Sequence, residues 1–99
     1  MAEVSAALAR YDRDEAFRAR IIALYRADRA RFISSVISLA VSESYGRREA
    51  VEFANAVTSR VRHDLLRESA REAHAKGRIT QADLEDRLRR IAFMEGQER

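Results

Sequence analysis

Residues 44–49, Ser-Tyr-Gly-Arg-Arg-Glu, separate two long amphipathic segments of nearly equal length. Gly46 stands where a helix would end in a left-handed cap. Two helices joined by so short a turn must lie antiparallel. The sequence therefore predicts a long helical hairpin, with one helix over residues 14–44 and the other over residues 48–76.

Each segment carries one apolar stripe at helical spacing. A two-helix hairpin cannot cover both of its apolar faces, so we expect two copies to pair in a dimeric bundle of the four-helix type. The stripe of the first segment holds Phe17, Ile21, Leu24, Tyr25, Phe32, Val36 and Leu39, and that of the second holds Ala50, Phe53, Ala54, Val57, Val61 and Leu65.

Shorter helices are expected on both sides of the hairpin, over residues 1–11 and 81–95. Gly77 ends the second segment, and Thr80 is a good N-cap for the last helix. In that helix Leu84, Leu88 and Ile91 form a narrow seam that suits docking in one groove. The whole chain, residues 1–99, is thus predicted to be a single all-α domain.

The composition supports this fold class and limits the cellular setting. Proline is absent, there are only three glycines, and the missing cysteines exclude disulfides and thiolate metal sites. The longest apolar stretch, residues 32–41, contains three serines and is too short to span a bilayer. No secretory signal is visible in residues 1–10, so we expect a cytoplasmic protein with no membrane contact.

Asp28 interrupts the apolar stripe of the first segment, between Leu24 and Phe32. A carboxylate in such a place is costly unless it is paired. We expect a buried ion pair with an arginine of a neighbouring helix, which would fix the register of the bundle. The alternative is a specificity residue in an otherwise apolar interface.

Basic and potentially basic side chains share one ridge of the second segment, which we call the Arg/His ridge: Arg60, His63, Arg67, Arg71 and His74. Such a ridge can follow a phosphate backbone or an acidic partner. Asp64, Glu68 and Glu72 lie beside it, at spacings that allow ion pairs along the helix. We favour a self-paired, solvated face.

The sequence contains no arrangement that supports catalysis. It has no Gly-rich phosphate loop, no cysteine nucleophile and no credible Ser–His–Asp set. His63 and His74 are 11 residues apart. This spacing is about 16 Å along a helix, too far for one metal ion. We therefore expect no catalytic residues, no cofactor, no metal and no enzymatic activity.

The predicted function is a non-enzymatic protein-interaction module: a small regulator, adaptor or inhibitor that acts by helical docking and oligomerisation. We expect a homodimer and a further protein partner. The predicted interface comprises Phe17, Ile21, Leu24, Asp28, Phe32, Val36, Leu39, Leu84, Leu88 and Ile91.

Two alternatives stay open. One is a basic helical DNA- or RNA-binding protein that uses the Arg/His ridge, although a net charge of +3 is a weak electrostatic footprint. The other is a structural subunit of a larger assembly.

Overall fold

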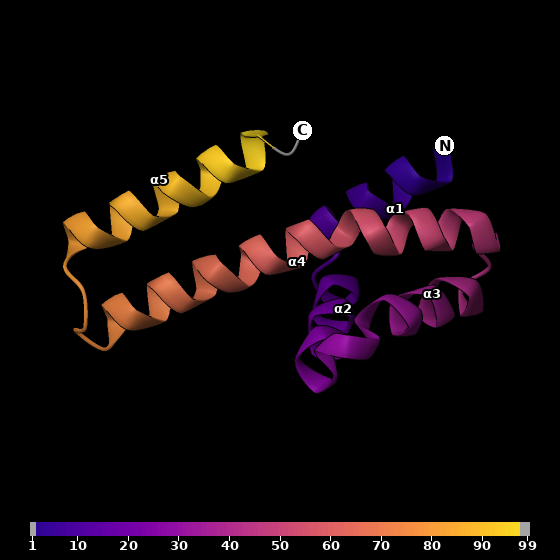
Figure 1. Cartoon of the computed structure of the whole chain (residues 1–99), viewed down its shortest axis with the longest axis horizontal. Coiled ribbons are helices and arrows are strands. Elements are labelled where there is room, and N and C mark those ends of the chain that lie inside the picture. Colours follow the sequence, from indigo (N-terminus) through magenta and orange to yellow (C-terminus); the bar gives the residue numbers. More distant parts are fainter. Residues whose placement is uncertain (1, 98–99) are drawn as a thin grey trace. The chain divides into compact units, whose positions relative to one another are not determined.

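The computed structural model of the chain describes the backbone of residues 2–97 and the side chains of residues 4–97. Within residues 2–97 all regular structure is helical, which confirms the predicted all-α class (Figure 1). The elements are α1 (Ala2–Arg13), α2 (Glu15–Ala27), the short 3-10 helix η1 (Arg29–Arg31), α3 (Phe32–Ser42), α4 (Arg47–Ala75) and α5 (Gln81–Gln97).

The chain divides into two compact units, residues 1–61 and residues 62–99, and each is described by itself. Helix α4 contributes its first half to the first unit and its second half to the second unit. The single domain, the long hairpin and the dimeric bundle stay predictions.

A short connection at Asp14 separates α1 from α2 in the first unit. Asp14 leaves the helical conformation, and its carboxylate accepts a hydrogen bond of 3.1 Å from the backbone N–H of Phe17. The Arg18 guanidinium donates to the carbonyls of Tyr11 and Asp12, at 3.1 and 2.9 Å. The N–H of Phe17 and the carbonyls of Tyr11 and Asp12, which lie at helix ends, thus find partners outside the regular helical hydrogen bonds.

The predicted continuous helix over residues 14–44 is wrong, because the chain breaks at Asp28. This residue is extended (φ −157°, ψ 95°), and its carboxylate accepts a hydrogen bond of 3.2 Å from the N–H of Arg31. Aspartate competes in this way for backbone donors and so favours caps over helix interiors. Asp28 is also exposed, and its ion pair is with Arg31, three residues on. The predicted buried pair with a neighbouring helix is therefore also wrong.

The break at Asp28 allows α2 and α3 to pack together below the first half of α4 (Figure 1). The rings of Phe17 in α2 and Phe53 in α4 stack with centroids 6.0 Å apart. Tyr25 meets Phe32 edge-on across the α2–α3 corner. The core of this unit consists of Ala7, Tyr11, Phe17, Ile21, Phe32, Val36, Ala40, Ala50, Phe53, Ala54, Val57 and Val61.

The turn between α3 and α4 differs from the prediction at Gly46. The left-handed residue is Ser44, with φ +73°, and the N–H of Tyr45 reaches back to the carbonyl of Ala40 at 3.1 Å. Gly46 instead precedes α4, where its carbonyl accepts the N–H of Ala50 at 2.8 Å. The atoms nearest to a Cβ added on Gly46 belong to the carboxylate of Glu49, the flexible end of a side chain that can move aside, so space alone does not require glycine there.

The second unit consists of residues 62–75 of α4, a turn, and α5. Gly77 adopts φ +72°, and the N–H of Arg78 donates to the carbonyl of Ala73 at 2.8 Å, as in a left-handed helix end. The Thr80 hydroxyl accepts the N–H of Asp83 at 3.1 Å, and the Asp83 carboxylate accepts the N–H of Thr80 at 3.3 Å. The predicted helix end at Gly77 and N-cap at Thr80 are thus confirmed.

Candidate interaction surfaces

Most of the apolar interface predicted on the first segment lies inside the first unit. Phe17, Ile21, Phe32 and Val36 are fully buried, and Leu24 and Leu39 are half-buried. The buried side chains cannot reach another molecule unless this unit opens. Sequence reasoning overestimated the surplus apolar surface because it did not foresee the break at Asp28, which folds the stripe around a local core.

The Arg/His ridge is not a continuous exposed surface. In the first unit, Arg60 forms an ion pair with Asp12 of α1. In the second unit, Arg67 pairs with Asp64 at 2.9 Å and with Glu95 of α5. His63 is buried, with its Nδ1 4.0 Å from Glu95.

Arg71, by contrast, is exposed, and His74 is half-buried. The ridge therefore pairs with acids of other helices as well as with Asp64 of its own helix. The partners are 48 residues away for Arg60 and 28 residues away for Arg67, and no signal in the sequence identifies contacts over that separation.

The polar residues between α4 and α5 hold these helices together rather than forming a reactive site. Glu95 lies beside both Arg67 and His63, so one carboxylate from α5 meets two nitrogen-bearing side chains of α4. Among the described residues, no group of three or more His, Asp or Glu side chains is placed to hold a metal ion. These contacts therefore join α5 to α4.

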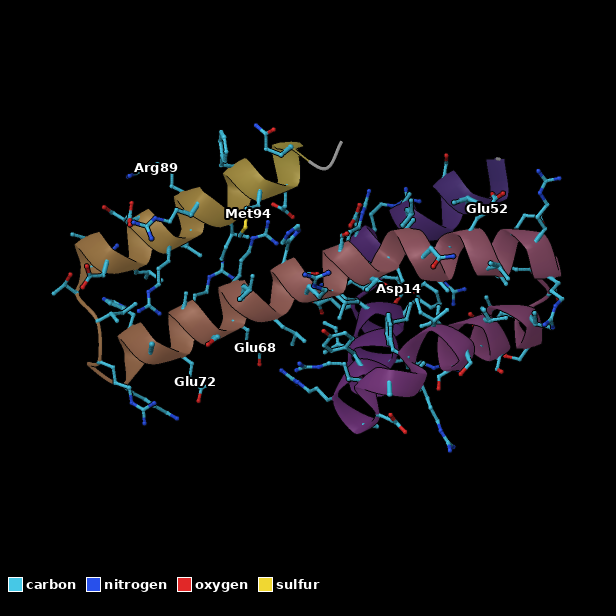
Figure 2. The ribbon with its side chains drawn as sticks, in the orientation of Figure 1. Asp14, Glu52, Glu68, Glu72, Arg89 and Met94 are labelled. Carbon is cyan, nitrogen blue, oxygen red and sulfur yellow. The ribbon has the colours of Figure 1, made fainter. Side chains whose placement is uncertain are left out.

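An exposed apolar surface lies on the second unit, at residues that differ from the predicted docking seam of Leu84, Leu88 and Ile91. Leu66 of α4 is 48% exposed, and Met94 of α5 is 40% exposed. Leu66 directly precedes Arg67, Met94 directly precedes Glu95, and Arg67 contacts Glu95. When two antiparallel helices touch through one residue each, the residues that directly precede those two point to the same side of the helix pair. Leu66 and Met94 therefore lie on the same side. We call Leu66 and Met94 the hairpin patch; Figure 2 labels Met94.

Phe93 is the most exposed large apolar side chain of the described residues, at 67%. It lies two positions after the buried Ile91, and about 200° around the helix at 100° per residue. Phe93 thus faces away from α4, on a different side of α5 from the hairpin patch. Leu84 and Leu88, predicted as docking residues, are half-buried beside α4, and Ile91 is buried.

A second exposed surface lies at the corner between α2 and α3, and it is strongly basic. We define the basic corner as Arg26, Arg29 and Arg31, all of which are exposed. The guanidinium carbon of Arg29 lies 5.1 Å from the centroid of the Tyr25 ring. The sequence pattern does not predict this surface, because the three arginines do not share one ridge of a continuous helix.

Comparisons with known proteins give no family for this chain. No protein-family model, no curated protein and no solved structure matches it. Over residues 2–97, no helix is both long enough and apolar enough to cross a membrane.

Proposed function

We propose that the protein is a non-enzymatic interaction module that docks through the second unit, and that a second copy of the chain occupies this surface. The observation that carries the proposal is the hairpin patch. Two large apolar side chains from different helices, Leu66 and Met94, are both nearly half exposed on one flank of a two-helix unit.

The second unit is too small to bury an adequate core by itself. Of its described apolar side chains, only Ala70 and Ile91 are fully buried. A pair of helices needs a further layer to cover its apolar stripes, and units below about 40 residues usually depend on such additions. The second unit of another copy supplies that layer, and Leu66 and Met94 of the two copies meet in an isologous interface.

The charge balance of the second unit is compatible with self-association. Residues 62–99 contain nine arginines and lysines and eight aspartates and glutamates, a net charge of +1. Two copies therefore repel each other only weakly. The interface should be held by apolar contact, so its affinity should change little with salt.

A regulator, adaptor or inhibitor of another protein would use the same surface, with the partner in place of the second copy. A structural subunit of a larger assembly would build on it in the same way. We also propose that the protein is cytoplasmic. The dimer is the arrangement that can be tested without knowing a partner.

The test is light scattering coupled to size-exclusion chromatography, at low and high salt. We expect a mass of about twice the 11.3 kDa chain for the wild type, and of one chain for the double variant Leu66→Asp and Met94→Asp. Phe93→Ser is the matched control, because it changes a more exposed neighbour on another side of α5 and should stay dimeric.

Either of two results would overturn the proposal. One is a monomeric wild type at tens of micromolar concentration. The other is dissociation by Phe93→Ser together with a dimer that survives loss of the hairpin patch. Circular dichroism of each variant establishes that it remains helical.

A further inference from the structure

The segment that contains the basic corner, residues 16–42, carries more net positive charge than the entire chain. Residues 16–42 contain five arginines and a single acid, Asp28, a net charge of +4. The whole protein has a net charge of +3, so the remaining residues together are slightly acidic. The segment from α2 to α3 is therefore where an anionic partner is attracted most strongly.

Two of these five arginines contact other segments of the first unit. Arg18 donates to carbonyls at the end of α1, and Arg20 approaches Glu43 at 3.6 Å. Arg26, Arg29 and Arg31 are exposed where the chain turns from α2 through η1 into α3. The Asp28 carboxylate lies 3.7 Å from the Arg31 side chain and neutralises part of its charge. The same carboxylate accepts the N–H of Arg31 and so caps η1.

Stacked side chains connect Arg29 of the corner to the core. The Arg29 guanidinium lies over the Tyr25 ring, and Tyr25 packs edge-on against Phe32 with ring centroids 5.1 Å apart. Phe32 is itself buried in the core. A guanidinium stacked in this way loses less freedom on binding, and its planar fork matches the oxygens of a phosphate.

The surroundings of the corner favour nucleic acid over a protein or a lipid surface. Among the described residues, the exposed large apolar side chains are Val41, Leu66, Phe93 and Met94, and none belongs to the corner. Protein interfaces need an apolar core, and membrane-surface helices insert apolar side chains. Interfaces with nucleic acid are polar and positively charged.

We propose that the basic corner binds the phosphate backbone of nucleic acid without reading its sequence, through Arg26, Arg29 and Arg31. This inference does not rest on dimerisation through the hairpin patch. It also differs from a site on the Arg/His ridge, where the side chains of Arg60 and Arg67 are only partly exposed and pair with acids of other helices. Three arginines neutralise about three phosphates, so binding is weak and strongly dependent on salt.

The test is fluorescence anisotropy of a labelled 20-base-pair DNA duplex, titrated with the full chain at several salt concentrations. Three phosphate contacts predict a slope near −3 for log affinity against log salt, or about a forty-fold loss between 50 and 200 mM. The triple variant Arg26→Glu, Arg29→Glu and Arg31→Glu should abolish binding. A second triple variant, with glutamine in place of the three arginines, removes the charge without reversing it and should also bind at least ten-fold more weakly.

The matched control carries Arg87→Glu, Arg89→Glu and Arg90→Glu, which make the same charge change on exposed positions of α5. We expect this control to retain most of the affinity. Equal losses in the control and in the corner variant would overturn the proposal, because the effect would then follow net charge alone.

A wild type that fails to bind the duplex at 50 mM salt would overturn the proposal as well. Binding to polyglutamate or to anionic vesicles with none to the duplex would assign the corner to another class of partner. A labelled RNA duplex, run in parallel, distinguishes the two sources of phosphate backbone. The dimer mass of the corner variant should equal that of the wild type, which separates failure here from failure of the proposed dimer.

Discussion

Arg10 and Glu43 form a two-pronged ion pair that joins α1 to the residue directly after α3. The Nη1 and Nη2 atoms of Arg10 donate to the two carboxylate oxygens of Glu43, at 2.9 and 3.1 Å. Arg10 also lies 4.0 Å from the centroid of the Phe17 ring. Hydrogen bonding to Glu43 raises the pKa of Arg10. The pair therefore ties three elements of the first unit together.

Removing the charge of Glu43 should weaken the first unit measurably. We expect Glu43→Gln to lower the free energy of unfolding by about 1 kcal/mol, since the pair is bidentate but partly exposed. Glu52→Gln is the control, because Glu52 meets Arg48 at 3.5 Å on an exposed helix surface and should cost only about 0.3 kcal/mol. Urea denaturation followed by circular dichroism gives both values. Equal losses for the two variants would show that the Arg10 pair has no special role.

Val36 and Val41 test whether the stripe of α3 is core or interface. Val36 is fully buried, whereas Val41, on the same helix, is 44% exposed. Val36→Ala should cost about 2 kcal/mol through lost burial and the cavity left behind, and Val41→Ala should stay within about 0.5 kcal/mol of the wild type. Neither variant should change the mass measured by light scattering. A stable Val36→Ala protein that loses its oligomeric state would instead support the interface predicted from the sequence.

The parts of the fold that the sequence predicts depend on local signals. Apolar periodicity identifies helices, and Gly77 with Thr80 marks a helix end and a new start through contacts within a few residues. The break at Asp28 is different, because the apolar period continues from Leu24 to Phe32 as if the helix were unbroken. Apolar periodicity shows which side of a helix is apolar, but it does not show where the helix axis changes direction.

The interaction surfaces were predicted less well because they depend on what covers each face. In the Arg/His ridge, Arg60 pairs with Asp12 and Arg67 pairs with Glu95, and both acids are distant in the chain from their partners. The basic corner and the hairpin patch become visible only when neighbouring helices define what is exposed. Single side chains such as Met94 therefore could not be assigned from their own helix alone.

Gly77 should be required for its backbone conformation and not for space. Its φ is +72°, yet nothing lies within 4 Å of a Cβ added there. Gly77→Ala should therefore lower the free energy of unfolding by about 1 kcal/mol, and Gly77→Asn by less. Gly96→Ala is the control, because Gly96 is helical with open space and the variant should be neutral or slightly more stable. Thermal unfolding of the three variants compares them, and an unaffected Gly77→Ala would contradict the left-handed turn.

Asp14 should make the first unit sensitive to acid. The N–H of Phe17, which donates to its carboxylate, and the nearby Arg10 lower the pKa of Asp14. A carboxyl group whose pKa is lower in the folded state stabilises the fold above its unfolded pKa, about 4, and loses that contribution as pH falls through the folded value. Stability should therefore decline below about pH 4 partly through this residue.

Two variants at Asp14, compared with the wild type, separate its charge from its role as a cap. Asp14→Asn keeps an acceptor for the N–H of Phe17 but cannot titrate, so its stability should depend less on pH than that of the wild type. Asp14→Ala loses the acceptor and should be the least stable of the three proteins at neutral pH. Urea midpoints measured from about pH 7 to pH 2 should converge for wild type and Asp14→Asn at the acid end, where the wild-type carboxyl is protonated. Parallel curves for these two proteins over the whole range would show that the charge of Asp14 contributes nothing, and that only the cap stabilises the start of α2.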